Sequence, residues 1–296
     1  VREHARRTLR DVDGYLARHP DAPDAERAWR WLFTTAREHR LEAEVLAAAE
    51  RYLSAQRDED DAALAALARQ VRCLALARTG KWEAALQCLD EHLRTVRLRS
   101  AGESVELALS LAAEAQLDGE MEAARAALER LNQAFLLNAS VREITESRLT
   151  RLGLADEPAP KLALEDLDGQ AIDLADFRGQ VVLIDFWATN CAPCLAELPA
   201  LKQLHSEHRD RGFAVIGISL DEERAVVEEF RETHKIPWRL ALSNQDENAT
   251  QERYRVRTIP ATFLVDRAGR VRYVDLHGED LREAVERLLE ENREAE

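Results

Sequence analysis

The chain has 296 residues, enough for two domains that each bury a hydrophobic core. With 46% apolar and 33% charged residues, its composition excludes a disordered or membrane-embedded chain. Its 41 basic and 56 acidic side chains leave a net charge of −15, which repels nucleic acid and anionic lipid. No stretch reaches the roughly 18 uninterrupted apolar residues of a membrane-spanning helix, so we expect no membrane span.

The two parts of the sequence differ in composition, which predicts two domains of different class. Val and Ile number 8 in residues 1–157 and 16 in residues 158–296, whereas Ala, Leu, Arg and Glu dominate the first part. Because β-branched residues favour strands, we predict an all-α domain over 1–157 and an α/β domain over 158–296. Gly153 and the prolines Pro158 and Pro160 mark the boundary near residue 157, since they end a helix and stiffen an extended connection.

Two segments of the first domain resemble each other and predict helical hairpins. Each begins with a glycine, Gly80 or Gly119, and continues with a bulky residue two positions later, then alanines and leucines at helical spacing. Glycine allows a sharp turn between two helices. The pattern resembles the tetratricopeptide repeat over about residues 65–135, without the Tyr and Pro positions of that repeat. Two roles stay open for these hairpins: a module that serves only for packing or oligomerisation, or a groove that binds a protein partner.

Cys73 and Cys88 fall inside these hairpins, on the predicted helices 67–78 and 82–93. An unpaired buried cysteine behaves as a small apolar residue, and Cys73 takes a position that a small residue normally fills between helices. We therefore predict a packing role for both cysteines. Their similar distances from the turn at Gly80 also allow a disulfide, which spacing alone does not decide.

The second domain alternates strands and helices. Its run at 181–187 is almost entirely apolar, as expected for a central strand that is covered on both faces. The order of elements predicts a mixed central sheet with helices on both faces, and catalytic groups at the carboxyl end of the central strand. The predicted strands cover residues 161–165, 171–173, 181–187, 213–220, 262–266 and 270–276, and the predicted helices cover about 191–209, 223–234 and 281–292.

Two cysteines, Cys191 and Cys194, stand directly after this strand, where the next helix begins. Unpaired backbone N–H groups and the positive end of the helix dipole stabilise a thiolate there, so we expect Cys191 to be the nucleophile. Cys194 lies about one helical turn further on, close enough to attack a mixed disulfide on Cys191, and Pro193 stiffens the loop between them. The pair therefore predicts a redox-active disulfide that exchanges with its dithiol form.

Zinc is the main alternative ligand for these cysteines, because His205 and His208 complete a Cys-x2-Cys-x10-His-x2-His pattern. On a helix, however, the step from Cys194 to His205 spans about 16 Å at 1.5 Å per residue, which is too far for a shared metal. We therefore expect no metal and no cofactor, and we expect both histidines to face solvent.

With these features the second domain resembles the TlpA/ResA-like thiol–disulfide oxidoreductases, a family with the thioredoxin fold. The resemblance covers about 140 residues in matching order. It implies a thioredoxin-like domain that acts on protein thiols and disulfides, together with an upstream electron donor or acceptor. The residues that carry it are 174–194, Glu197, Pro199, 216–221 and 254–266.

Residue by residue, the resemblance implies that Pro260 follows a cis peptide bond beside the cysteines. It also implies that the backbone of Ile259 pairs with a substrate segment in the manner of a strand. Asn190 departs from the family, which usually has Trp before the first cysteine, and it therefore bears on the choice of partner. We also assign Trp187, at the end of the central strand, to the substrate-binding surface.

Two carboxylates are candidates for proton transfer. Asp185 lies in the apolar central strand and matches the buried acid of thioredoxins, while Glu197 follows Cys194 by three residues and matches an acid of the TlpA/ResA group. Burial raises the pKa of a carboxylic acid towards the range in which it can take the proton from Cys194. The alternatives are a hydrogen-bonded core acid for Asp185 and a surface residue for Glu197.

The sequence thus predicts a thiol–disulfide oxidoreductase, with reduction of protein disulfides as the favoured direction. A thiol peroxidase is disfavoured, because Ile184 and Ala188 stand where the peroxidase signature needs Pro and Thr or Ser. The other alternative is a helical-repeat interaction protein whose thioredoxin-like domain only binds, although such modules generally lack one or both cysteines. The 18 basic and 28 acidic side chains of residues 158–296 favour a basic or neutral substrate over an acidic one.

The family resemblance implies an extracytoplasmic bacterial setting, periplasmic or anchored through a removed segment. The chain opens at Val1 without the charged and then apolar pattern of a signal peptide. That opening fits a mature protein as well as a cytoplasmic one, so the compartment stays open at this point.

Overall fold

The computed structural model describes residues 2–55, 61–96, 101–246 and 249–291. The chain divides into two compact units, Val1–Arg142 and Glu143–Glu296, and each is described by itself. Within the described ranges, no helix is both long enough and apolar enough to cross a membrane.

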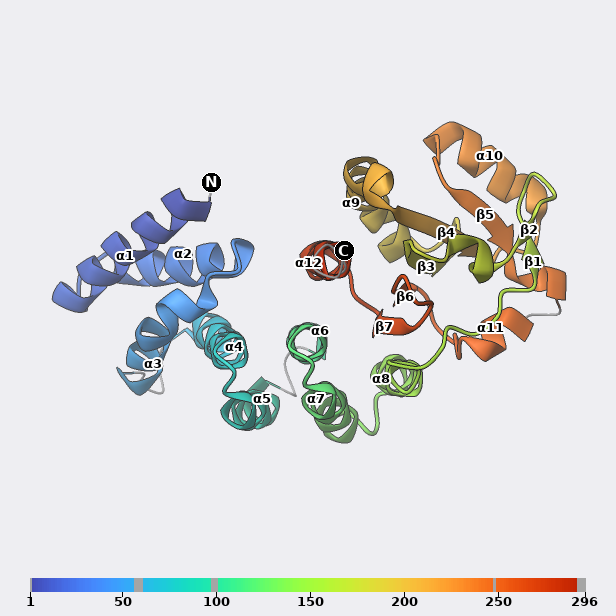
Figure 1. Ribbon diagram of the computed structural model, residues 1–296. Coiled ribbons are helices and arrows are strands. Elements are labelled where there is room, and N and C mark those ends of the chain that lie inside the picture. The colour runs from blue at the N-terminus through green and yellow to red at the C-terminus, as the bar shows by residue number, and fades with distance from the viewer. Residues whose placement is uncertain (1, 56–60, 97–100, 247–248, 292–296) are drawn as a thin grey trace. The chain divides into compact units, whose positions relative to one another are not determined.

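The first unit is helical, as the sequence predicted (Figure 1). α4 packs against α5 and α6 against α7, and each pair turns at a glycine in the left-handed region, Gly80 with φ 73° and Gly119 with φ 79°. The helices are α1 (Arg2–Arg18), α2 (Ala25–Glu38), α3 (Leu46–Ala55), α4 (Ala62–Arg78), α5 (Trp82–Val96), α6 (Ala101–Leu117) and α7 (Met121–Ala134), with a short 3-10 helix at Glu42–Val45.

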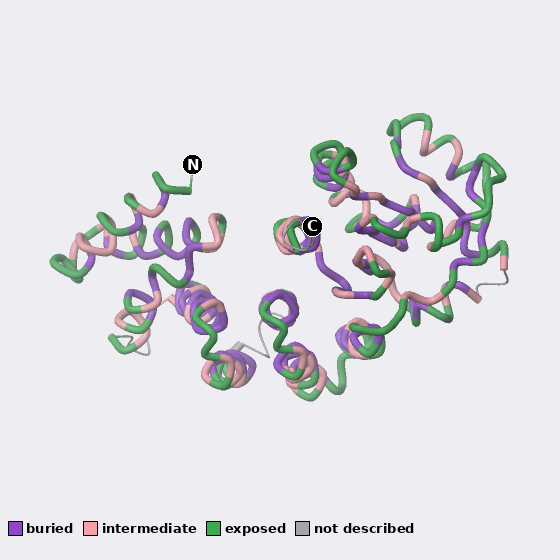
Figure 2. Tube along the Cα trace, in the orientation of Figure 1, coloured by how far each residue is buried: buried purple, intermediate pink, exposed green. Residues whose placement is uncertain are grey.

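Equivalent positions of the two hairpins are buried. Ala85 and Ala124, five residues after the two glycines, are both 0% exposed, and Leu89 and Leu128 lie one turn further along the same faces. Figure 2 shows these helices buried on one side and exposed on the other. The hairpins therefore form because each helix has an apolar stripe that its partner covers.

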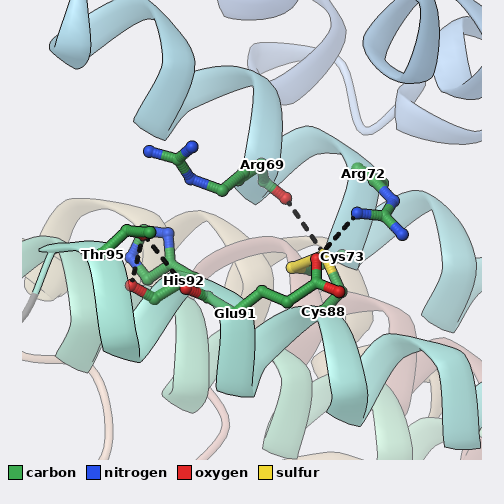
Figure 3. The surroundings of a disulfide bond; sticks show 7 residues. All are labelled: Arg69, Arg72, Cys73, Cys88, Glu91, His92 and Thr95. Carbon is green, nitrogen blue, oxygen red and sulfur yellow. Dashed lines mark hydrogen bonds and ion pairs between the residues drawn. A yellow bond between two sulfur atoms is a disulfide. The ribbon is translucent and has the colours of Figure 1, made fainter. Parts of the chain in front are cut away.

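Cys73 on α4 and Cys88 on α5 form a disulfide, with their Cα atoms 5.4 Å apart (Figure 3). The prediction that both cysteines only pack in the core is therefore wrong, and the alternative of a disulfide holds. The reason is the turn at Gly80: in an antiparallel hairpin, positions at similar distances on either side of the turn lie opposite each other. Both residues are buried, with 0% and 1% exposure.

Polar groups surround this disulfide (Figure 3). The Sγ atom of Cys88 lies 3.6 Å from the backbone oxygen of Arg69, and Arg72 forms an ion pair with Glu91. His92, one turn after Cys88, is fully buried, and neither of its ring nitrogens has a hydrogen-bond partner among the described residues. Burial and the nearby Arg69 lower the pKa of His92 to about 4, so its ring is neutral at pH 7.

The second unit contains the mixed central sheet that the sequence predicted, in the strand order β5-β4-β3-β6-β7. β3 runs parallel to β4 and antiparallel to β6, and a separate β1–β2 hairpin lies outside this sheet. The strands are β1 (Leu164–Glu165), β2 (Ala171–Ile172), β3 (Val181–Trp187), β4 (Phe213–Ser219), β5 (Arg239–Leu242), β6 (Ala261–Val265) and β7 (Val271–Val274).

Helices cover both faces of the sheet (Figure 1). Residues of α9, α10 and α12 pack with β3 around one cavity, while Tyr254, directly after α11, packs on the opposite face against Phe186 and Phe263. The helices are α8 (Ala139–Leu152), α9 (Ala192–His208), α10 (Arg224–His234), α11 (Ala249–Arg253) and α12 (Gly278–Glu290), with 3-10 turns at Leu174–Phe177, Arg209–Arg211 and Ser243–Asp246.

Most of α8 belongs to the second unit, so the units divide ahead of the boundary that the sequence placed near residue 157. The side chain of Arg151 is 1% exposed and donates to both carboxylate oxygens of Asp275, at 3.0 and 2.9 Å. Ser147 accepts a second hydrogen bond from Arg151 and lies 3.1 Å from the hydroxyl of Thr258. These contacts fix α8, which is helical by composition, to the sheet that follows it in sequence.

Candidate active site

The two cysteines of the Cys-Ala-Pro-Cys motif lie where β3 gives way to α9. Cys191 is the N-cap residue of α9, and its Sγ accepts the backbone N–H of Cys194 at 3.3 Å. The two residues form a disulfide with their Cα atoms 5.3 Å apart. Cys191 is 9% exposed and Cys194 is half-buried. The backbone N–H groups and dipole at this helix start stabilise negative charge on the Cys191 sulfur.

The loop before Cys191 is held by Asp221, which follows β4. Its carboxylate accepts the backbone N–H of Thr189 at 2.9 Å, the hydroxyl of Thr189 at 2.7 Å and the hydroxyl of Ser219 at 2.6 Å. Asn190, between this anchor and Cys191, is exposed. Residue 221 belongs to the segment 216–221 that carries the family resemblance, but no local pattern predicts its role as an anchor.

A second loop lies beside the cysteines. The Ile259–Pro260 peptide bond is cis, and Pro260 lines the same cavity as Cys194. The backbone N–H and C=O of Ile259 have no hydrogen-bond partner among the described residues. Thr258 is tied to α8, since its hydroxyl lies 3.1 Å from that of Ser147. A held loop with free backbone groups is suited to pairing with an extended peptide.

A small cavity of about 40 Å³ lies behind Cys194, and it is large enough for more than one water molecule. Trp187 forms part of its wall and is 6% exposed, with its ring centroid 4.9 Å from that of Phe230. The structure therefore places Trp187 inside the unit rather than on its surface. The polar residues that line the cavity with Cys194 are Asp185, Glu197, Thr262 and His277.

The carboxyl groups of the cavity differ in setting. Asp185 has no hydrogen bond or ion pair among the described residues, and burial together with the nearby Glu197 raises the pKa of Asp185 to about 7. Glu197 is half-buried and accepts the backbone N–H of Gly278 at 3.2 Å. Asp185 is thus a carboxyl that exchanges its proton near neutral pH, directly behind the pair of cysteines.

Two polar residues of this cavity were not predicted from the sequence. Thr262 stands opposite Asp185 in the β3–β6 pairing, and His277 caps the start of α12. Neither carries a recognisable local motif. Strand register identifies Thr262, but only the packing of α12 brings His277 to the cavity.

The two histidines of the discarded zinc pattern lie away from the cysteines. His205 packs against the rings of Phe213 and Trp238. His208 is 5% exposed, so the expectation that it faces solvent is wrong, because the end of α9 packs against α12. Among the described residues, no group of three or more His, Cys, Asp or Glu side chains is placed to hold a metal ion.

Comparisons with known proteins agree with this geometry. The profile described as the AhpC/TSA family matches residues 155–274. The thiol–disulfide oxidoreductase ResA of Geobacillus kaustophilus is 33% identical over 132 residues, which cover 45% of this chain and 74% of that protein. ResA of Bacillus cereus is 31% identical over 131 residues, which cover 44% of this chain and 74% of that protein.

Solved structures show similar coverage. The thioredoxin domain of a thiol–disulfide oxidoreductase from Bacteroides vulgatus is 32% identical, with a TM-score of 0.44, and the match covers 46% of this chain and 97% of that chain. A thiol:disulfide interchange protein from Chlorobium tepidum is 26% identical, with a TM-score of 0.41, and the match covers 45% of this chain and 95% of that chain.

Proposed function

Since the chain belongs to the ResA family of thiol–disulfide oxidoreductases, we propose that it reduces protein disulfides through Cys191 and Cys194. One observation carries this assignment: Cys191 caps α9, bonded to Cys194 and beside the cis peptide bond before Pro260. Each further role below builds on that geometry.

The exchange runs in two steps that start from the dithiol. The Cys191 thiolate attacks a substrate disulfide, so a mixed disulfide forms and the first substrate thiolate leaves. The Cys194 thiolate then attacks the Sγ of Cys191, which forms the Cys191–Cys194 disulfide and releases the second substrate thiolate. Protons from the medium neutralise both thiolates that leave. A dithiol donor reduces the disulfide again by the same exchange.

Asp185 is the proposed acceptor for the proton that Cys194 loses in the second step. Its pKa of about 7 matches that task, because an acid of this strength takes and returns a proton near neutral pH. Glu197, half-buried at the same cavity, adds negative charge that raises the pKa of Asp185.

The substrate segment is proposed to lie along Ile259, whose backbone N–H and C=O are free among the described residues. Asn190 is exposed next to Cys191 and would contact the substrate directly. Trp187 contributes from within, as a wall that holds the position of the cysteine loop. The acidic second domain favours a basic or neutral substrate.

We also propose an extracytoplasmic location, with the helical domain as a tetratricopeptide-like module for a protein partner. The buried Cys73–Cys88 disulfide supports the location, because structural disulfides persist in oxidising compartments. We propose that the sequence domains are 1–157 and 158–296. By this division α8 belongs to the first domain, whereas most of it packs in the second compact unit.

Substitution of each active-site cysteine tests the function. Cys191→Ser should abolish the reduction of insulin by a dithiol, while Cys194→Ser should still attack and should accumulate a mixed disulfide that mass spectrometry detects. The variant with both Cys73→Ala and Cys88→Ala serves as a control, because it removes two cysteines without touching the site. Full activity of Cys191→Ser would reject catalysis in favour of a binding module.

A further inference from the structure

We propose that His277 is a positioning residue for proton transfer, in which its imidazole orders the water that joins Cys194 to the carboxyl groups behind it. The inference rests on the redox function proposed above for Cys191 and Cys194. It adds a residue that lies outside the cysteine motif, the cis-proline loop and the two acids.

Three neighbouring strands bring His277 to the cavity. Asp185 on β3 stands opposite Thr262 on β6. The hydroxyl of Thr262 donates to the backbone oxygen of Leu276 at 3.0 Å, just after β7. His277 is the next residue, so a continuous set of backbone and side-chain contacts fixes it relative to Asp185.

A second contact ties the other side of His277 to Glu197. The backbone N–H of Gly278, the first residue of α12, donates to Oε2 of Glu197 at 3.2 Å. The residue before His277 is therefore connected to Asp185 through Thr262, and the residue after it is hydrogen-bonded to Glu197. This explains why His277 lines the same cavity as Cys194 although it lies far along the chain.

The ring of His277 has an unsatisfied nitrogen. Its Nε2 is buried and has no hydrogen-bond partner among the described residues. A buried polar atom left unpaired costs free energy, so such atoms usually bind water when the site has room. The cavity of about 40 Å³ has that room, and Cys194 and Asp185 line it together with His277.

Burial and nearby arginines keep this ring neutral. The charged groups around His277 are Arg148 and Arg151 of α8 and the carboxylate of Asp275, which opposes them, while Asp185 and Glu197 line the same cavity. Burial, and next Arg148, lower the pKa of His277 to about 4. At pH 7 the imidazole therefore binds water without competing with Asp185 for the proton.

In the second step, which resolves the mixed disulfide, one sulfur–sulfur bond forms and another breaks. As the Sγ of Cys194 bonds to the Sγ of Cys191, the sulfur–sulfur bond to the substrate breaks and its electron pair leaves with the substrate sulfur. The Cys194 proton passes to the ordered water, and that water gives a proton to the Asp185 carboxylate. His277 holds the water through Nε2 and neither gains nor loses a proton over the step.

The test measures the rate of the second step against pH, by the disappearance of a mixed disulfide preformed on Cys191. His277→Leu removes the hydrogen bond and should slow this step about tenfold, less than the loss of a proton acceptor itself, and should change its pH profile. His277→Gln retains a hydrogen-bonding group and should stay within about twofold of wild type.

His208→Leu is the control, because the Nε2 of His208, like that of His277, is buried and lacks a hydrogen-bond partner among the described residues, with the Glu286 carboxylate near it at 3.7 Å. His208 lies near the other end of α9, about 21 Å from Cys194 at 1.5 Å per residue. This variant should react like wild type. Equal losses in His277→Leu and His208→Leu, or a folded His277→Leu variant with wild-type rates, would overturn the proposal.

A measurement on the unsubstituted protein covers the case in which His277→Leu does not fold. Ring-nitrogen NMR should show the His277 Nε2 signal change on reduction of the Cys191–Cys194 disulfide, while the His208 signal stays fixed. An Nε2 chemical shift of His277 that is the same in the oxidised and the reduced protein would contradict the inference. The parent function is judged separately by Cys191→Ser, so failure of His277 leaves that judgement intact.

Discussion

The two disulfides have almost the same backbone spacing, with Cα atoms 5.4 Å apart for Cys73–Cys88 and 5.3 Å apart for Cys191–Cys194. Their surroundings differ in every other respect. The first pair closes a separation of 15 residues between two helices and is fully buried. The second closes a separation of 3 residues at the start of one helix, where Cys191 is 9% exposed and Cys194 is half-buried.

Position in the fold, rather than the geometry of the bond, therefore decides which cysteine pair is suited to exchange. Around Cys191 there are backbone donors, a cavity and an acid that exchanges protons near pH 7. Around Cys88 there is the backbone carbonyl oxygen of Arg69, which cannot stabilise a thiolate, and the neutral ring of His92. The first pair is suited to hold α4 against α5, and the second to exchange.

The largest expected difference between the two disulfides is in their rates of reduction. With limiting dithiothreitol, Cys191–Cys194 should open at least about a thousandfold faster than Cys73–Cys88, because attack needs an accessible sulfur and a stabilised leaving thiolate. Timed alkylation followed by mass spectrometry of the two cysteine peptides measures both rates. Equal rates would show that burial of the helical pair gives no protection.

Removal of the helical disulfide should change stability and leave catalysis unchanged. The free energy of unfolding of the Cys73→Ala, Cys88→Ala variant should be about 3 kcal/mol lower than that of wild type. This is the loss expected when a closed loop of about 15 residues is opened. Guanidinium unfolding followed by circular dichroism measures it, and wild type under reducing conditions is the matched reference. A loss of insulin reduction in this variant would mean that the two pairs are not independent.

Local patterns predicted much of the catalytic domain. The apolar run of β3, the helix start at Cys191 and the mixed sheet all follow from residues that are close in sequence. β5 was missed because its four residues, Arg239–Leu242, are too few to show a period. Its place in the sheet depends on β4, which pairs with it in parallel.

Long-range contacts were beyond such patterns. Arg151 and Asp275 are 124 residues apart, so the helical composition of α8 predicted its structure but not the unit in which it packs. His277 became part of the site for the same reason, since α12 carries it to a cavity formed mainly by earlier elements. The Cys73–Cys88 pairing lies between these cases: the hairpin allowed it, and only the packing of α4 on α5 decided it.

Asp185→Asn tests the acid behind the catalytic pair through the pH dependence of the free energy of unfolding. The pKa of Asp185 is about 7 in the folded protein against 3.8 for an ordinary aspartate, so its burial cost grows as pH rises from about 4 to 7. For a fully desolvated carboxyl this difference in pKa corresponds to about 4 kcal/mol. Because the side chain of Asp185 is only partly buried, we expect the neutral variant to be more stable by about 2 kcal/mol at pH 8 and equal to wild type near pH 4.

Guanidinium unfolding at pH 4 and pH 8 measures that difference, and the same variant should resolve mixed disulfides more slowly because its proton acceptor is gone. Asp168→Asn, in an exposed turn, is the control and should show no such pH dependence. If Asp185→Asn were no more stable at pH 8 than wild type, the carboxyl would not be the costly buried acid described here.

The smallest expected effect concerns His92, the histidine beside the helical disulfide. Its pKa of about 4 lies below the usual 6.5, so the unfolded chain takes up a proton that the folded unit refuses, and stability is lost as pH falls from about 6.5 towards 4. His92→Leu should remove about 1 kcal/mol of this loss at pH 5 and change little at pH 7. Urea unfolding at both pH values measures it, with the exposed His4→Leu as control. A pH dependence unchanged by His92→Leu would assign the acid sensitivity to other groups and would contradict a neutral His92 beside the Cys73–Cys88 pair.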